Sequence, residues 1–236
     1  MLRTAEGKFT LLLIFVCASI TTASAQVEFG LKGGLNESEI MTSDQQFVVV
    51  NGNTQQLRNF PRVGFHGGVL VSIPLSKKFS FQPEAMFSTQ GANGKPTLGY
   101  LVSATEEYRF NYIDVPLLLK YTFPSGLFLE TGPQIGYLVS VDIDEDVVGS
   151  YYTSHYHPKS QYKSTDLSWA LGAGYLSPVN VGFDIRYNLG LTDFSNGSPA
   201  GMQSTPVQNG SVRNSVIQIG VFYLFGKPRI AARRES

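Results

Sequence analysis

The residues of this sequence best suited to chemistry are two histidines that follow a group of carboxylates. His155 and His157 stand two positions apart. The acidic residues that precede them are Asp142, Asp144, Glu145 and Asp146. Imidazole and carboxylate groups can bind a metal ion or act as general acids and bases. A zinc site needs three or four ligands in a fixed geometry, however, and a histidine pair at positions i and i+2 of a polar segment is more often exposed to solvent. We therefore expect neither a metal ion nor a cofactor here.

Other signatures of catalysis are missing from the sequence. The spacing of the residues pairs no nucleophile with a base, and there is no glycine-rich phosphate loop of the Walker type. The sequence therefore predicts a protein that is not an enzyme.

The composition restricts both the fold and the partners. The chain has 236 residues, of which 42% are hydrophobic and 15% are charged, so it is long and apolar enough for one sizeable folded domain. The 18 basic residues equal the 18 acidic ones in number, which argues against the basic surface of a nucleic-acid-binding protein. The 24 glycines, 12 tyrosines and 16 phenylalanines favour an all-β chain.

The N-terminal segment has the pattern of a secretory signal peptide. Basic residues precede the apolar run 9–20, and the small residues Ala23, Ser24 and Ala25 follow it. The run is too short for a membrane-spanning helix, which needs about 20 residues. We therefore expect residues 1–25 to be cleaved off. Cys17, the only cysteine, lies in this leader, and an exported chain without disulfides fits a bacterial cell envelope.

The strongest structural signal is a regular alternation of apolar and polar residues in segment 181–192. All six odd positions, from Val181 to Leu191, are apolar or aromatic, and none of the even positions is. A period of two indicates a β-strand with one apolar and one polar face. The strand is longer than an ordinary strand of a globular protein. It is also long enough to cross a membrane, for which a tilted strand needs about 9–11 residues.

The same alternation recurs along the chain. It predicts eight strands, at residues 27–36, 62–73, 79–88, 108–123, 127–142, 167–175, 181–192 and 217–225. In strand 108–123 the apolar positions change parity near Tyr112 and Ile113, which predicts a β-bulge. The connections are alternately long, at 37–61, 91–107, 143–165 and 193–212, and short, at 74–77, 124–126 and 177–180. An even number of strands joined in this way is the arrangement of an outer-membrane barrel.

We therefore predict an all-β fold, an eight-stranded antiparallel transmembrane β-barrel with up-and-down topology, in a bacterial outer membrane. The barrel domain spans residues 26–225, and a short basic tail follows at 226–236. The alternation by itself leaves one alternative open. In a soluble barrel of the lipocalin type, the apolar face would turn inward around a ligand.

In a membrane barrel the polar face lines the lumen, and here that face carries charges of both signs. An eight-stranded barrel is just wide enough for side chains to fill, so paired charges would plug it rather than line a channel. We expect a structural polar network in the lumen and no small-solute pore. The predicted members of this network are Glu28, Lys32, Arg62, His66, Glu84, Asp114, Lys120, Glu130, Asp184 and Arg186.

Several short motifs add a family resemblance. They are GLKGGLN at residues 30–36, FQPE at 81–84, STQG at 88–91, YIDVPLLLKY at 112–121 and ETGP at 130–133. With these motifs the chain resembles the PorT-like outer-membrane β-barrel proteins of Bacteroidota, which share the architecture of OmpA and OmpX. The resemblance implies the location and the fold. It implies less about activity, although one member of that family serves a protein-secretion apparatus.

The expected function is a structural or interaction role in which the rigid barrel displays four long surface loops. The resemblance adds an accessory part in protein secretion. The expected partners are outer-membrane lipid, lipopolysaccharide and envelope proteins that contact the loops, and nucleic acid is not expected. A small-solute porin and an enzyme with its site at the loop rim are the alternatives.

Overall fold

The structure is a computed structural model that describes residues 27–42, 47–50, 53–56, 59–94, 97–98, 102–147, 153–157, 159–194 and 212–226. The predicted signal peptide and nearly all of the tail lie outside these residues, as does most of the connection at 193–212. Within the described residues no helix is both long and apolar enough to cross a membrane.

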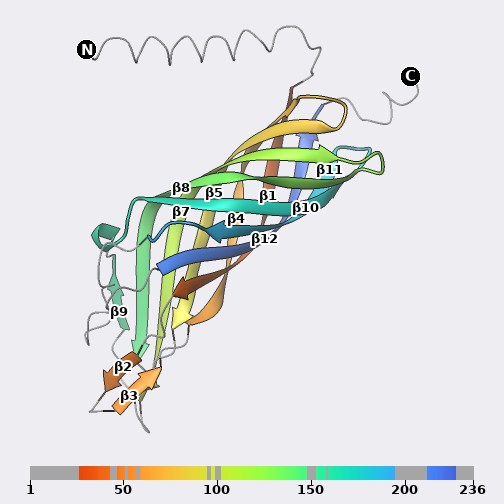
Figure 1. The fold of residues 1–236 in the computed structure, drawn as a ribbon. Helices are drawn as coiled ribbons and strands as arrows, with labels where there is room; N and C mark the ends of the chain where they lie inside the picture. The colour runs from red at the N-terminus through yellow and green to blue at the C-terminus, as the bar shows by residue number, and fades with distance from the viewer. Residues whose placement is uncertain are drawn as a thin grey trace, which may run out of the picture.

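Eight long antiparallel strands form a closed barrel (Figure 1). They are β1 (Glu28–Thr42), β4 (Asn59–Pro74), β5 (Phe79–Gly94), β7 (Val102–Thr122), β8 (Leu127–Val147), β10 (Thr165–Leu176), β11 (Val181–Gly190) and β12 (Val212–Phe225). Each strand pairs with the next one around the barrel. The barrel closes because β1 also pairs with β12, with Phe29 opposite Phe225. The predicted eight-stranded up-and-down barrel is confirmed.

The short elements belong to the long connections. β2 (Phe47–Val50) and β3 (Asn53–Gln56) form a hairpin, and β6 (Thr97–Leu98) pairs with the beginning of β7. β9 (Thr153–Tyr156) pairs with the end of β8, and the 3₁₀ helix η2 (Lys159–Gln161) follows it. Figure 1 shows β2, β3 and β9 at the end of the barrel opposite to the one where β1 begins and β12 ends.

The large apolar side chains face outward. On β11, Phe183 and Ile185 are 55% and 53% exposed, whereas Asp184 and Arg186 between and beside them are 4% and 1% exposed. β10 and β12 show the same alternation. An apolar surface around the whole barrel is favourable in hydrocarbon and costly in water. The barrel is therefore inverted relative to a soluble one, which excludes the lipocalin-type alternative.

Aromatic side chains pack edge to face at the end with the short turns. The ring centroids of Phe79 and Tyr121 lie 5.0 Å apart, and those of Tyr121 and Phe123 lie 4.8 Å apart. Tyr223 and Phe225 form a third pair, at 5.2 Å. Aromatic residues at the ends of membrane strands lie at the level of the lipid headgroups, and short turns are typical of the periplasmic end of such barrels.

β7 and β8 continue well beyond the strands predicted for them. Each has 21 residues, which at about 3.3 Å per residue gives a length of about 70 Å. The outward positions near the start of β7 are the polar residues Glu107, Arg109 and Asn111, so this end of the strand lies outside the hydrocarbon. The loops predicted at 91–107 and 143–165 were therefore wrong in part, because paired strands occupy much of them.

The predicted β-bulge lies between β7 and β8, but its extra residue is on β8. Asn111 pairs with Ser140 and the next residue, Tyr112, pairs with Leu138, so Val139 is the additional residue. β7 itself keeps one parity throughout, with the even positions 108 to 120 buried inside the barrel.

The change of apolar parity in β7 has a different cause, because the barrel interior itself becomes apolar towards the long connections. The buried members of this interior cluster are Tyr108, Phe110, Tyr112, Leu138, Val141, Ile143, Tyr162 and Phe194. The bulge turns Val141 into the cluster, where it is 1% exposed. In the predicted strand 127–142, regular alternation would place Val141 on the outer face with Leu127 and Leu129, and for Val141 this was wrong.

Candidate functional site

Arg186 is the centre of an ion-pair network in the barrel lumen. Its Nη1 donates to Oε2 of Glu84 and its Nη2 to Oε1, both at 2.9 Å. Its Nε and Nη2 also donate to Oε1 of Glu130, at 2.9 and 2.7 Å. No more than 1% of any of these three side chains is exposed. The guanidinium thus has a bidentate carboxylate partner, which is the strongest arrangement for such a pair.

Two lysines and a further carboxylate complete the network. Nζ of Lys32 lies 2.5 Å from Oδ2 of Asp184 and 3.8 Å from Oε1 of Glu84. Nζ of Lys120 lies 3.5 Å from Oε2 of Glu130. We call the following six residues the charged plug: Lys32, Glu84, Lys120, Glu130, Asp184 and Arg186. Its three cations balance its three anions.

The strand pattern positions the plug. All six residues occupy even positions on β1, β5, β7, β8 and β11, where side chains point into the barrel. On β10, Gly172 pairs with Glu130 on one side and with Arg186 on the other. A Cβ on Gly172 would lie 3.0 Å from Cγ of Glu130. The glycine therefore leaves the space across which Arg186 and Glu130 meet.

An apolar layer fills the lumen on the periplasmic side of the plug. Its buried members are Leu70, Phe128, Leu176, Phe222 and Leu224. Nζ of Lys120 lies 3.9 Å from the ring centroid of Phe128 and 4.8 Å from that of Phe222. These cation–π contacts join the layer to the plug.

Two further predicted network members lie inside the barrel beside the plug. Nδ1 of His66 is 2.7 Å from Oδ1 of Asn36, and both residues are buried. Asp114, which is 3% exposed, accepts a hydrogen bond from Nε2 of Gln90 at 3.0 Å. Neither His66 nor Asp114 takes part in the ion pairs of the plug.

The structure places the other two predicted members, Arg62 and Glu28, at opposite ends of the barrel. Nε of Arg62 and Nη2 of Arg109 both donate to Oε1 of Glu107, at 3.0 Å each, towards the long connections. Burial raises the pKa of Glu107, but the hydrogen bonds from Arg109 and Arg62 outweigh burial and hold that pKa below its ordinary value. Glu28 lies at the periplasmic end, near Gly226.

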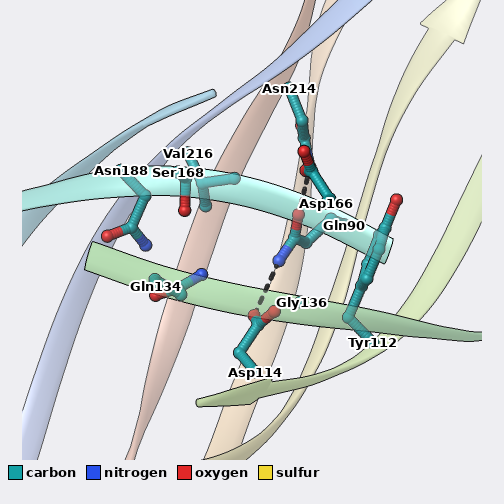
Figure 2. A pocket seen from close by; sticks show the side chains of 10 residues that line it. All are labelled: Gln90, Tyr112, Asp114, Gln134, Gly136, Asp166, Ser168, Asn188, Asn214 and Val216. Atoms are coloured by element: carbon teal, nitrogen blue, oxygen red, sulfur yellow. Dashed lines mark hydrogen bonds between the residues drawn. The ribbon is translucent and has the colours of Figure 1, made fainter. Parts of the chain in front are cut away.

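A small chamber with mostly polar lining residues lies in the barrel lumen (Figure 2). Its volume of about 10 Å³ holds about one water molecule. Asn214 donates a hydrogen bond to Gln90, which in turn donates to Asp114. The residues that line the chamber are Gln90, Tyr112, Asp114, Gln134, Gly136, Asp166, Ser168, Asn188, Asn214 and Val216.

Sequence reasoning did not single out most of these chamber residues. Asp166 and Asn214 lie just before the predicted starts of their strands, at 167 and 217. Gln134 and Asn188 lie on the predicted polar face but carry no charge. The alternation, extended towards the N-terminal end of β10 and β12, is the signal that would have found the first two.

The two histidines of the third long connection do not share a site. Nδ1 of His155 lies 2.6 Å from Oδ1 of Asp144, and Nδ1 of His157 lies 2.7 Å from Oδ1 of Asp142. The two histidine side chains are 63% and 73% exposed. The side chains of Glu145 and Asp146 lie outside the described part of the chain. Across the described residues, no group of three or more histidine, cysteine or acidic side chains is arranged to hold a metal ion.

The inverted barrel agrees with a match between the sequence and a family model. The model of the outer membrane protein beta-barrel domain matches residues 19–196, which is most of the chain. The chain belongs to this family. Membership and the outward apolar surface together place the protein in a bacterial outer membrane.

Solved structures are distantly similar to the chain. Ail of Yersinia pestis, in complex with the heparin analogue sucrose octasulfate, is 12% identical, with 84% of this chain and 99% of Ail covered and a TM-score of 0.44. Neisserial surface protein A is 12% identical, with 83% and 96% covered and a TM-score of 0.45. The outer membrane protease OmpT of Escherichia coli is 13% identical, with 87% and 100% covered and a TM-score of 0.40. No curated protein sequence matches the chain. Beyond the family, the comparisons therefore assign no activity to the chain.

Proposed function

We propose that this outer-membrane barrel is a closed scaffold that displays binding loops at the cell surface. The observation that carries the proposal is the filled lumen. The charged plug spans the barrel between β5, β8 and β11, with side chains that are at most 1% exposed around Arg186. Apolar clusters lie on both sides of the plug. This filling disfavours the alternative function as a small-solute porin.

The surface end supports a role in binding. The β7–β8 hairpin extends beyond the hydrocarbon, and the exposed pairs His155–Asp144 and His157–Asp142 lie at its far end with β9. Ionisable side chains held in fixed pairs on rigid strands are suited to contacts with polar groups of lipopolysaccharide or of other envelope proteins. The resemblance to PorT-like barrels adds the finer proposal that one such partner belongs to a protein-secretion apparatus.

An enzyme at the rim is the second candidate, and the two histidine–carboxylate pairs are the observation that favours it. A histidine held by a carboxylate can act as a general base. The pairs are widely exposed, however, whereas catalytic pairs work in sites from which water is excluded. We therefore rank a binding role first. Replacing His155 and His157 by alanine in a screen of peptide and ester hydrolysis would reveal catalysis, if the wild-type protein has activity that the variant lacks.

Two measurements test the proposed scaffold. In planar lipid bilayers the wild-type barrel should show no stepwise conductance. Steady porin-like steps from the wild-type protein would overturn the closed scaffold. In cells, a photo-crosslinking residue at His157 should capture envelope components, and the same residue at Lys77, in the exposed periplasmic turn, serves as the matched control. Equal capture at the two positions would argue against binding through the surface loops.

A further inference from the structure

The lumen chamber holds two buried carboxylates, those of Asp114 and Asp166, that form no ion pair with any described cation. Arg186 of the charged plug acts on Asp114 electrostatically, but no cation of the plug forms an ion pair with Asp114 or Asp166. Asp114 and Asp166 are 3% and 8% exposed, and they interact electrostatically with each other. Buried charges are normally paired or coordinate a metal ion.

A second observation also points to an occupant of the chamber. The side chain of Asn188 is 2% exposed and lines the chamber, yet neither its Oδ1 nor its Nδ2 has a hydrogen-bond partner. Oδ1 of Asn214, which is 7% exposed, also has none. Leaving buried polar atoms without partners is costly, so native interiors rarely do it. The side chains of two asparagines and two aspartates thus line one small space.

The size and chemistry of the chamber select the occupant. About 10 Å³ admits one water molecule or one monatomic ion and excludes any organic solute. A water molecule would satisfy an amide but would bring no positive charge to the two carboxylates. The available donors are oxygen atoms, which hard cations prefer, and Ca²⁺ accepts carboxylate and amide oxygens in flexible geometry. Mg²⁺ usually keeps several of its own waters, for which the chamber has no room.

We propose that the lumen chamber binds one dehydrated divalent cation, best matched by Ca²⁺, with Asp114 and Asp166 as the charged ligands and Asn188 and Asn214 as neutral oxygen donors. The site is independent of what the surface loops bind. Because the side chains that line the chamber are buried, the ion enters as the barrel folds and exchanges slowly afterwards.

The test uses the full-length barrel refolded in detergent with Ca²⁺ or with a chelator. Refolding with Ca²⁺ should raise the temperature at which the folded band disappears in a boiled-versus-unboiled gel by several degrees. The double variant Asp114→Asn, Asp166→Asn should lose that shift. Asp142→Asn, a carboxylate of the exposed rim, is the matched control and should keep it. Equal melting of the wild-type protein with Ca²⁺ and with chelator would overturn the proposal.

A second measurement locates the ion and remains informative if the double variant does not fold. Tb³⁺ replaces Ca²⁺ and emits when a nearby tyrosine is excited, and Tyr112 lines the chamber. Tyr112→Phe should remove most of the emission while Ca²⁺ still protects the barrel against heat. Asn188→Ala should weaken Ca²⁺ binding by about tenfold or more. Emission that Tyr112→Phe leaves unchanged, or Ca²⁺ binding that Asn188→Ala leaves unchanged, would place the ion elsewhere and refute the site.

Discussion

Arg186 on β11 and Glu84 on β5 form a bidentate ion pair across the barrel lumen, although 102 residues separate them in sequence. Neither strand is a neighbour of the other in the sheet. The pair therefore bridges two walls of the barrel that are not neighbours in the sheet, and it holds β5 and β11 at a fixed separation.

Removing the cation of this pair should be strongly destabilising. Arg186→Ala leaves Glu84 and Glu130 buried without their main partner, so we expect a loss of about 3–5 kcal/mol in the free energy of unfolding. Urea unfolding in lipid vesicles, followed by the fluorescence of Trp169, the one tryptophan of the chain, measures it. The double variant Arg186→Met, Glu84→Gln should recover part of the loss, because it leaves Lys32 paired with Asp184 and Lys120 paired with Glu130. A single variant as stable as wild type would contradict the ion-pair network.

The space at Gly172 should be as necessary as the charges themselves. A Cβ there would lie 3.0 Å from Cγ and Oε1 of Glu130 and from the backbone oxygen of Ile185. We expect Gly172→Ala to cost about 1–3 kcal/mol of stability, because the plug must shift to accommodate it. Gly67→Ala is the matched control, since its Cβ would meet only the backbone oxygen of Lys32 at 3.8 Å. Equal effects of the two substitutions in urea unfolding would contradict the requirement for space at Gly172.

The free-energy cost of a charged residue on the outward face should depend on its depth in the membrane. Ile185, in the middle of β11 and 53% exposed, faces hydrocarbon, so Ile185→Arg should destabilise the inserted barrel by about 2–4 kcal/mol. Leu75 is also exposed, at 61%, but it lies in a periplasmic turn. Leu75→Arg should therefore cost at most about 1 kcal/mol. Equal costs in vesicles would mean that β11 does not face lipid.

The stability of the barrel end near the long connections should depend on pH through Glu107. Its pKa in the folded protein is lowered by Arg109 and Arg62 against the opposing effect of burial. The pairing therefore stabilises the fold at pH values above the ordinary carboxyl pKa, and this stabilisation is lost as the pH falls through the lowered folded-state value. An NMR titration of the Glu107 carboxyl group should give a midpoint below that of an ordinary glutamate. Arg62→Met should raise this midpoint, and an unchanged midpoint would argue against the pairing.

The sequence pattern predicted the barrel because lipid and lumen impose opposite polarity on alternate residues. The segment 181–192 shows this most clearly, and β11 follows it residue by residue from Val181 to Gly190. The pattern failed where the interior itself became apolar. Tyr108, Phe110 and Tyr112 point inward, so the alternation in β7 weakens there although the strand continues.

The limits of the alternation pattern also explain which features of the lumen were predicted from the sequence and which were not. The parity of Glu84 and Arg186 shows that both point inward, but their distance depends on the register of strands that are not neighbours. The separation of Arg62 and Glu28 from the plug depends on height along the barrel, which alternation does not encode. The chamber was not predicted, because Asp166 and Asn214 precede the points at which the alternation becomes regular.

The distribution of the charged plug over five strands has a consequence for membrane insertion. If β11 slipped by one residue against its neighbours, Asp184 and Arg186 would point into the lipid, and Phe183 and Ile185 would point into the lumen. An arginine in the hydrocarbon costs about 2–4 kcal/mol, and the slipped barrel would also lose the partners of Glu84 and Glu130. The plug therefore favours the correct strand register, because only that register brings all six charges together in the lumen as the barrel closes.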